Sequence, residues 1–184
     1  MPQNERVEAL SPEVAEKYCE VLVHQILDAG VEYDFVIVIL GGAHWVWSYL
    51  REIVPFKRKY EVWATHYREN ELHPSGEVVY RDFPTELAGH GLVVDDCTDS
   101  ADALCGTRER CYQIGATQVD TGVVLCKRDN IRVIDPRTGL KFWPTFVGWE
   151  NAPGNIFFDF PREAFKKRII AARLARASQV QVAV

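Results

Sequence analysis

The 184-residue sequence lacks three features, and each absence excludes a class of protein. No apolar run approaches the roughly 20 residues that cross a bilayer, and residues 1–6 are polar, so we expect neither a membrane anchor nor a signal peptide. A basic excess is also missing, since 21 Lys and Arg stand against 26 Asp and Glu and give a net charge of −5. A nucleic-acid partner, which requires a basic face, is therefore not expected. The five cysteines form no Cys-x-x-Cys pair and are odd in number, which indicates a reducing compartment and a cytoplasmic protein.

The composition is that of an ordinary globular domain. Hydrophobic residues make up 47% and charged residues 26% of the chain, which argues against disorder over most of its length. Domains usually contain roughly 100 to 200 residues. We therefore expect residues 1–184 to form a single domain.

Strand and helix patterns alternate along the chain. Ser11-Pro12, followed by apolar residues at helical spacing, predicts a capped helix that ends at Gly30. The continuous apolar run 35–40 is typical of a parallel strand that is buried on both faces, residues 119–126 resemble a second buried strand, and together they favour βαβ units. Residues 162–178 combine basic and apolar residues at helical spacing and predict an amphipathic C-terminal helix.

The stretch from Gly91 to Leu104 is the clearest candidate functional segment. Its apolar run ends in Asp95 and Asp96, and a short loop containing Asp99 leads into a helical pattern. Ligands of α/β sheets bind beyond the carboxyl ends of parallel strands, so these carboxylates should face a crevice. Successive side chains of a strand point to opposite sides, so we expect Asp95 and Asp96 to hold two different groups of a diol. The backbone N–H groups at the helix start should form a nest for an anion. An Asp-rich turn that merely caps a helix is the alternative.

Three further segments carry candidate ligand-binding residues. Gly41-Gly42 follows a strand and lets the backbone approach a ligand closely. Lys127 follows the strand 119–126 and should point into the same crevice as the acids, while Phe146 offers a flat apolar face for stacking. His66 and Tyr67 precede a polar stretch that we expect to be a mobile loop. Each segment has a local alternative. Gly41-Gly42 is then a common turn, Lys127 lies in a basic loop facing water, Phe146 is a core aromatic, and the stretch after Tyr67 is a solvated hairpin loop.

Together these motifs resemble the type I phosphoribosyltransferases, most closely the hypoxanthine-guanine branch. Asp95, Asp96 and Asp99 fall where the family's ribose-phosphate loop has its acids, and Lys127-Arg128 and Phe146-Val147-Gly148-Trp149-Glu150 resemble base-binding segments. The resemblance spans residues 33 to 163. It implies an α/β fold with a central, mainly parallel sheet flanked by helices. Residues 33–130 would form the core, and a small hood would come from the N-terminal segment and residues 131–163.

The resemblance implies transfer of a phosphoribosyl group from phosphoribosyl pyrophosphate to a 6-oxopurine-like base, with Mg²⁺ as the cofactor and a homo-oligomeric protein. Asp99 would be the catalytic residue that shares a proton of the purine's five-membered ring. Lys127, Phe146 and Val147 would bind the base, and His66 and Tyr67 would belong to the flexible loop. Asp95 and Asp96 would also bind the metal ion. The ribose and phosphate would be bound by a larger set: Asp95, Asp96, Thr98, Ser100, Ala101, Asp102, Ala103, Gly41 and Gly42.

The sequence also departs from the family's pattern. Leu40 stands where the family has a basic residue before Gly-Gly, and Gly154 stands where it has an acid. Ser100-Ala101-Asp102-Ala103 replaces Thr-Gly-x-Thr in the phosphate loop. These departures leave two alternatives open. One is a nucleotide-binding or regulatory relative with weak or no catalysis, and the other is a transferase of the same fold with an altered sugar donor.

Overall fold

The computed structural model describes residues 6–40, 43–65, 67–68, 71–72 and 78–159. The glycine pair Gly41-Gly42, His66 and the expected C-terminal helix 162–178 therefore lie outside the described residues. Among the helices that are described, none is both long and apolar enough to cross a membrane.

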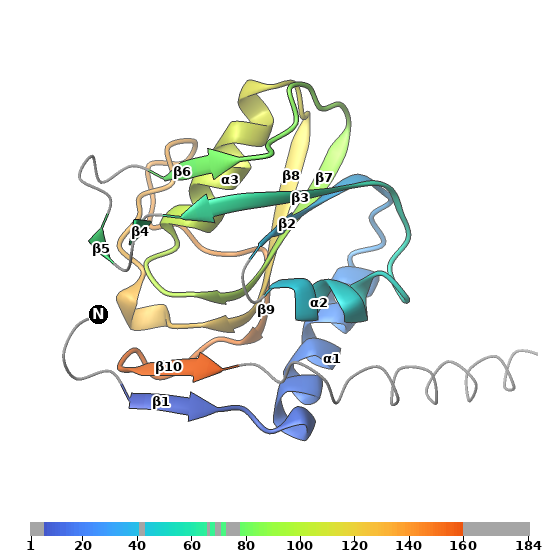
Figure 1. Ribbon diagram of the computed structural model, residues 1–184. Coiled ribbons are helices and arrows are strands. Elements are labelled where there is room, and N and C mark those ends of the chain that lie inside the picture. Colours follow the sequence, from blue (N-terminus) through green and yellow to red (C-terminus); the bar gives the residue numbers. More distant parts are fainter. Residues whose placement is uncertain (1–5, 41–42, 66, 69–70, 73–77, 160–184) are drawn as a thin grey trace, which may run out of the picture.

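A six-stranded sheet forms the centre of the molecule (Figure 1). Its strand order is β6-β3-β2-β7-β8-β9; β6 runs antiparallel to β3, and every other neighbouring pair is parallel. The predicted α/β fold with a central, mainly parallel sheet is thereby confirmed. The strands are β2 (Tyr33–Ile39), β3 (Phe56–Thr65), β6 (Val79–Arg81), β7 (His90–Thr98), β8 (Gln118–Cys126) and β9 (Phe146–Trp149).

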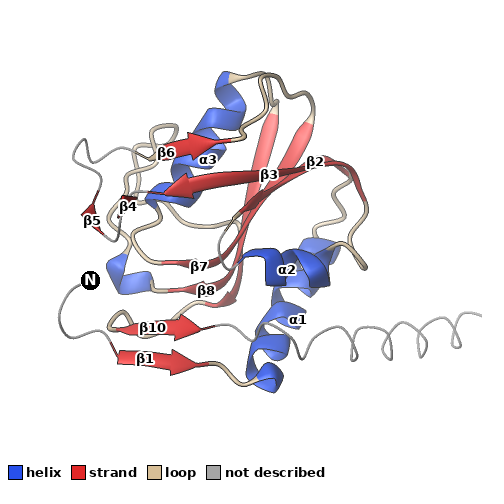
Figure 2. Ribbon diagram, in the orientation of Figure 1, coloured by secondary structure: helices blue, strands red, loops and turns tan. Residues whose placement is uncertain are grey.

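Helices cover both faces of this sheet (Figure 2). Helices α1 (Pro12–Asp28) and α2 (Ala43–Leu50) share one hydrophobic cluster with Val36 and Val94, whereas α3 (Asp102–Gln113) shares the other with Ile37 and Val93. Neighbouring residues of β2 and β7 thus point to opposite faces, and both faces are buried. A one-turn helix, η1 (Arg128–Asn130), follows β8.

Helix α1 begins where the sequence predicts. The Ser11 hydroxyl accepts a hydrogen bond from the Val14 N–H (3.4 Å), and Pro12 occupies the first helical position. Gly30 follows the last turn with a φ of 63°, a left-handed conformation that favours glycine.

Two small strand pairs lie outside the main sheet. β1 (Arg6–Ala9) runs parallel to β10 (Ile156–Asp159), so the beginning and the end of the described chain lie side by side. β4 (Tyr67–Arg68) pairs with β5 (Glu71–Leu72) in antiparallel fashion. The division into a core and a hood stays a prediction.

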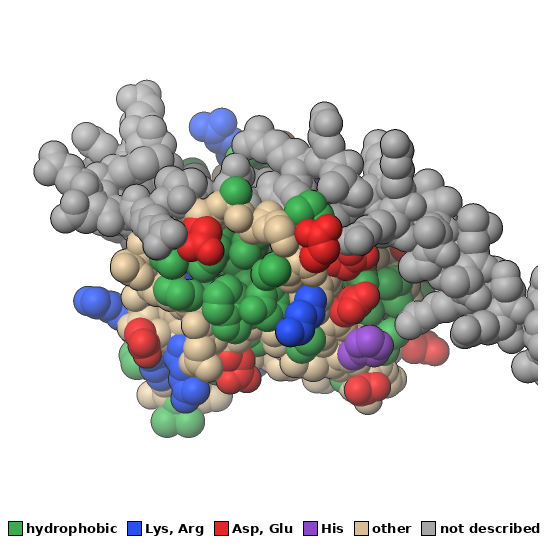
Figure 3. All heavy atoms as spheres, turned by 90° about the horizontal axis from the view of Figure 1, so that it is seen from below, with side chains coloured by type: hydrophobic (Ala, Val, Ile, Leu, Met, Phe, Trp, Pro, Cys, Tyr) green, Lys and Arg blue, Asp and Glu red, His purple; other side chains and the backbone are tan. Residues whose placement is uncertain are grey.

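The face of the molecule on the side of β1 and β10 carries hydrophobic side chains on its surface. In the space-filling view of this face, hydrophobic side chains gather in the middle, with acidic and basic side chains around them (Figure 3). Hydrophobic side chains are thus visible on the surface of this face.

Candidate functional site

The carboxyl ends of β7 and β8 lie side by side and bring the predicted acids and Lys127 together. Thr98 pairs with Cys126 in the parallel register, and the Lys127 N–H donates to the Thr98 carbonyl (3.0 Å). Asp99 and Lys127 are therefore the first residues after two paired strands. The Leu40 N–H donates to the Val62 carbonyl (2.7 Å), so the chain leaves the same end of β2 just before the glycine pair.

Asp95 and Asp96 are adjacent near the end of β7, where Asp95 is buried and Asp96 is partly buried. Burial raises the pKa of Asp95 well above its usual range, and both the charge of Asp96 and a hydrogen bond between the two side chains raise it further. Burial also raises the pKa of Asp96. The Asp96 N–H donates to Asp95 Oδ1 (2.9 Å). The expectation that the two side chains hold two different groups of a diol stays a prediction, although the two carboxyl groups influence each other electrostatically. The raised pKa values favour retention of a proton at this pair, and a ligand that uses both carboxylates as anions must displace it.

Asp99 is the most accessible acid of the site. Its side chain is 47% exposed, and its Oδ2 lies 3.5 Å from the Nζ of Lys127, whose side chain is only 4% exposed. Asn130, a residue that no sequence motif indicates, donates from Nδ2 to the other oxygen, Oδ1 (2.5 Å). The neighbouring Cys97 is unsuited to act as a nucleophile, because burial strongly raises the pKa of its thiol.

The loop predicted to bind phosphate has a backbone shape that glycine would favour. Ala101 has φ 72° and ψ 8°, the left-handed conformation, and is only 3% exposed. It is the N-cap of α3 and gives that helix no side-chain capping bond; the Asp102 N–H donates to Ser100 Oγ at a long distance (3.5 Å). The start of α3 therefore offers backbone N–H groups to an anion. Thr98 before the loop is buried, and Ala103 lies in the first turn of α3.

The predicted base-binding residues Phe146 and Val147 contact α1. Phe146 is 8% exposed and belongs to the hydrophobic cluster of α1 and α2. The Val147 N–H donates to Gln25 Oε1 (2.9 Å), and Gln25 Nε2 donates to the Val147 carbonyl (3.0 Å). The two backbone groups that the resemblance assigns to the purine edge are thus bound by a side-chain amide of the protein. No local pattern predicts this contact, since the two residues are 122 positions apart.

Gly148 and Trp149 also pack on α1. A Cβ atom at Gly148 would lie 2.4 Å from the Tyr18 carbonyl oxygen, so only glycine permits this close approach of helix and strand. The Trp149 ring stacks on the Tyr18 ring, with centroids 4.9 Å apart and planes 13° from parallel. Helix α1 therefore contacts the whole of β9.

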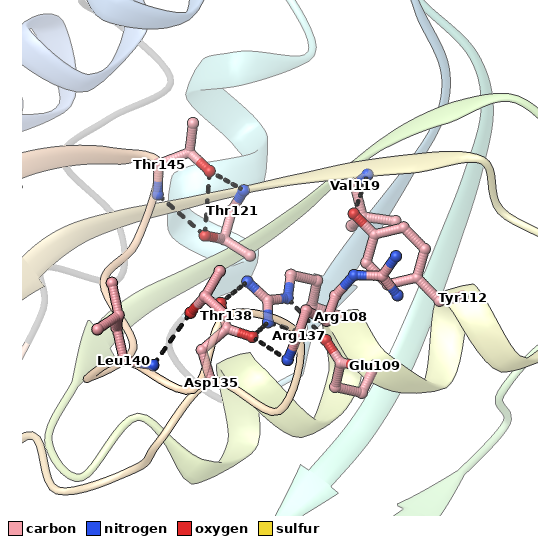
Figure 4. A network of polar contacts seen from close by, with 10 residues as sticks. All are labelled: Arg108, Glu109, Tyr112, Val119, Thr121, Asp135, Arg137, Thr138, Leu140 and Thr145. Atoms are coloured by element: carbon pink, nitrogen blue, oxygen red, sulfur yellow. Dashed lines mark hydrogen bonds and ion pairs between the residues drawn. The ribbon is translucent and has the colours of Figure 1, made fainter.

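An ion-pair network fixes the connection between β8 and β9 (Figure 4). The Arg108 guanidinium donates to both oxygens of Asp135 (3.1 and 2.5 Å), and this contact lowers the pKa of Asp135. Arg108 also lies over the Phe142 ring, 4.9 Å from its centroid. At the other end of the connection, the Thr121 N–H donates to Thr145 Oγ1 (3.1 Å). The segment that leads into β9 is thus held against α3 and β8.

The acids fit Mg²⁺ only when a ligand supplies further oxygens. Among the described residues, no group of three or more His, Cys, Asp or Glu side chains could hold a metal. Mg²⁺ commonly binds one or two carboxylates together with substrate phosphates. Asp95 and Asp96 provide such carboxylates.

Structural comparison shows that the chain has the type I phosphoribosyltransferase fold. A purine phosphoribosyltransferase from Pyrococcus horikoshii matches with a TM-score of 0.63 and 15% identity, over 86% of this chain and 95% of that one. A hypoxanthine-guanine phosphoribosyltransferase from Bacillus anthracis matches with a TM-score of 0.58 and 18% identity, over 74% and 78%. A hypothetical protein from Neisseria gonorrhoeae with bound ppGpp matches with a TM-score of 0.62 and 22% identity, over 95% and 98%. No family model and no curated protein matches the sequence.

Proposed function

We propose that this protein is a purine phosphoribosyltransferase that transfers a phosphoribosyl group from phosphoribosyl pyrophosphate to a 6-oxopurine-like base. The observation that carries the proposal is the left-handed conformation of Ala101 at the start of α3. Strained residues cluster at functional sites, and this one lies at a helix N-terminus, where backbone N–H groups can bind an anion. A cytoplasmic location and a homo-oligomeric state are part of the same proposal.

In this proposal each side chain has a distinct task. Asp95 and Asp96 bind the ribose hydroxyls, and they would also hold Mg²⁺. When bound, Mg²⁺ neutralises the negative charge of the leaving pyrophosphate. Asp99 is exposed enough to share the proton of the purine nitrogen that bonds to the sugar. The buried ammonium of Lys127 donates to the six-position oxygen of the base.

Phe146 and Val147 contribute to base binding only if α1 releases them. Gln25 holds both backbone groups of Val147, and Phe146 is buried against the same helix. In the present arrangement, Lys127 is the predicted base-binding residue that lies beside Asp99. Base recognition therefore rests mainly on Lys127.

A second candidate is a nucleotide-binding protein without turnover. It is favoured by the contact of Gln25 with Val147, which occupies the groups expected to read the base. It is also favoured by the likeness to the ppGpp-bound Neisseria gonorrhoeae protein, which extends over nearly the whole of both chains. The ligand would then be a purine nucleotide that places a phosphate at the start of α3.

One experiment separates the two candidates. The protein is mixed with Mg²⁺, phosphoribosyl pyrophosphate and hypoxanthine, guanine, xanthine or adenine in turn, and pyrophosphate and nucleotide are measured. Phosphoribosyl pyrophosphate, GMP and ppGpp are titrated calorimetrically in parallel. Turnover that is lost in Asp99→Asn supports the transferase. Tight binding of GMP or ppGpp without turnover supports the second candidate, and neither binding nor turnover contradicts both.

A further inference from the structure

Asn130 joins three loops that meet at the candidate site. It is the last residue of η1, and its Nδ2 donates to Asp99 Oδ1 (2.5 Å) and to the Gly154 carbonyl oxygen (3.0 Å). Asp99 follows β7, Asn130 follows β8, and Gly154 precedes β10. A single side chain therefore fixes the position of the acid relative to two other segments.

The partners of the Asn130 amide determine its orientation. An amide nitrogen carries two hydrogens, and here each has an acceptor. A flipped amide would place Oδ1 against the Asp99 carboxylate and the Gly154 carbonyl, which are both acceptors. The side chain is thus held in one orientation, with its donors toward Asp99 and Gly154.

Gly154 is matched to Asn130 by close contact. A Cβ atom at position 154 would lie 2.5 Å from Asn130 Oδ1 and 3.0 Å from both Cγ and Nδ2. Gly154 is not among the glycines with positive φ, so the need for glycine comes from this contact and not from the backbone conformation. The glycine that replaces the family's acid therefore makes room for the Asn130 amide.

Each oxygen of Asp99 faces a donor of the protein. Asn130 donates to Oδ1, and the Lys127 ammonium lies 3.5 Å from Oδ2. The carboxylate is still 47% exposed, so the remaining lone pairs are open to a ligand. The two protein donors thus leave the solvent-exposed part of the Asp99 carboxylate available to a ligand.

We propose that Asn130 is the positioning residue of this site, which together with Gly154 holds the Asp99 carboxylate toward the bound nucleotide. This inference rests on the proposed function for its consequences in ligand binding. The contact between Asn130 and Asp99 can be tested without a ligand.

The ligand-free test exchanges the two partners. Asn130→Asp keeps the shape of the side chain but places a second carboxylate beside Asp99, so the urea midpoint should fall at pH 8 and recover toward pH 5. Adding Asp99→Asn restores a donor and an acceptor between the two side chains but not the donor toward the Gly154 carbonyl, so it should recover part of the stability lost at pH 8. Asn155→Ala, at an exposed neighbouring position, is the control and should leave the urea midpoint unchanged at both pH 8 and pH 5. If the two substitutions act additively, the inference is overturned.

The ligand test uses GMP as the probe. Asn130→Asp should weaken the binding of GMP at pH 8 by about tenfold or more, because it removes the hydrogen bond from Asn130 to the charged Asp99 carboxylate. The Kd of Asn130→Asp for GMP, divided by the wild-type Kd, should become smaller toward pH 5. If Asn130 only stabilised the fold, this ratio would be the same at each pH. Gly154→Ala alone should weaken the binding of GMP. Added to Asn130→Ala, the same substitution should have no further effect on the Kd. A constant ratio overturns the inference; wild-type protein that binds neither GMP nor phosphoribosyl pyrophosphate overturns the proposed function instead.

Discussion

Substitution of Ala101 by glycine tests the strained loop directly. Ala101 is the N-cap of α3 at φ 72°, and L-residues pay about 1–2 kcal/mol for this conformation. Glycine would remove that cost. It would also lose one buried methyl, worth about 0.8 kcal/mol, and would add about 0.4–1 kcal/mol of chain entropy to the unfolded state. These contributions nearly cancel, so Ala101→Gly should leave the free energy of unfolding almost unchanged.

The control for this prediction is Ala103→Gly in the first turn of the same helix. Ala103 has no positive φ, so glycine there relieves no strain and should cost about 0.5–1 kcal/mol. For a protein of this size, a loss of that order lowers the Tm by about 1–4 °C. Urea unfolding followed by tryptophan fluorescence measures both variants. Equal losses in the two variants would refute the assignment of a left-handed residue at position 101.

Three further predictions concern the acids and the phosphate loop. Because burial and Asp96 raise the pKa of Asp95, the folded protein holds its proton more tightly, and this stabilisation is lost as the pH rises through the folded-state pKa. Asp95→Asn should therefore raise the Tm at pH 8, with a smaller gain at pH 4; a gain that grows at low pH would contradict the raised pKa. The double variant Ala101→Gly with Ala103→Thr should bind phosphoribosyl pyrophosphate more tightly in calorimetry, and an unchanged Kd would show that the phosphate is held elsewhere. Arg108→Met leaves the buried carboxylate of Asp135 without its cation and should cost about 3–5 kcal/mol in urea unfolding; a loss below 1 kcal/mol would indicate that the pair is solvated.

The sequence predicts those parts of the molecule that depend on local pattern. Continuous β-branched runs such as 35–40 indicate strands buried on both faces, and Ser11-Pro12 marks the start of α1. The acidic strand end is visible for the same reason, because Asp95 and Asp99 are neighbours in the chain. The rule of alternating side chains does not by itself indicate that the charge of Asp96 raises the pKa of Asp95, since that depends on how close the two side chains lie near the strand end.

Contacts between distant segments could not be predicted in this way. Gln25 is one polar residue in an amphipathic helix, and nothing near it in the sequence indicates that its amide binds Val147. Asn130 and Gly154 are equally inconspicuous, because their fit arises only when the loops before β10 and after β8 meet. Such contacts are determined by tertiary packing, which has no local sequence signal.

The two halves of the candidate site depend on different kinds of contact. The phosphate loop offers backbone N–H groups at the start of α3, and these donors are present whatever side chains flank them. The segment around Val147 instead needs a free strand edge and a free ring face, and α1 contacts both the backbone edge of Val147 and the ring of Phe146. In the proposed function, the ribose phosphate therefore supplies most of the affinity, and the base is selected chiefly by Lys127 and by the carboxylate of Asp99 that Asn130 holds in place.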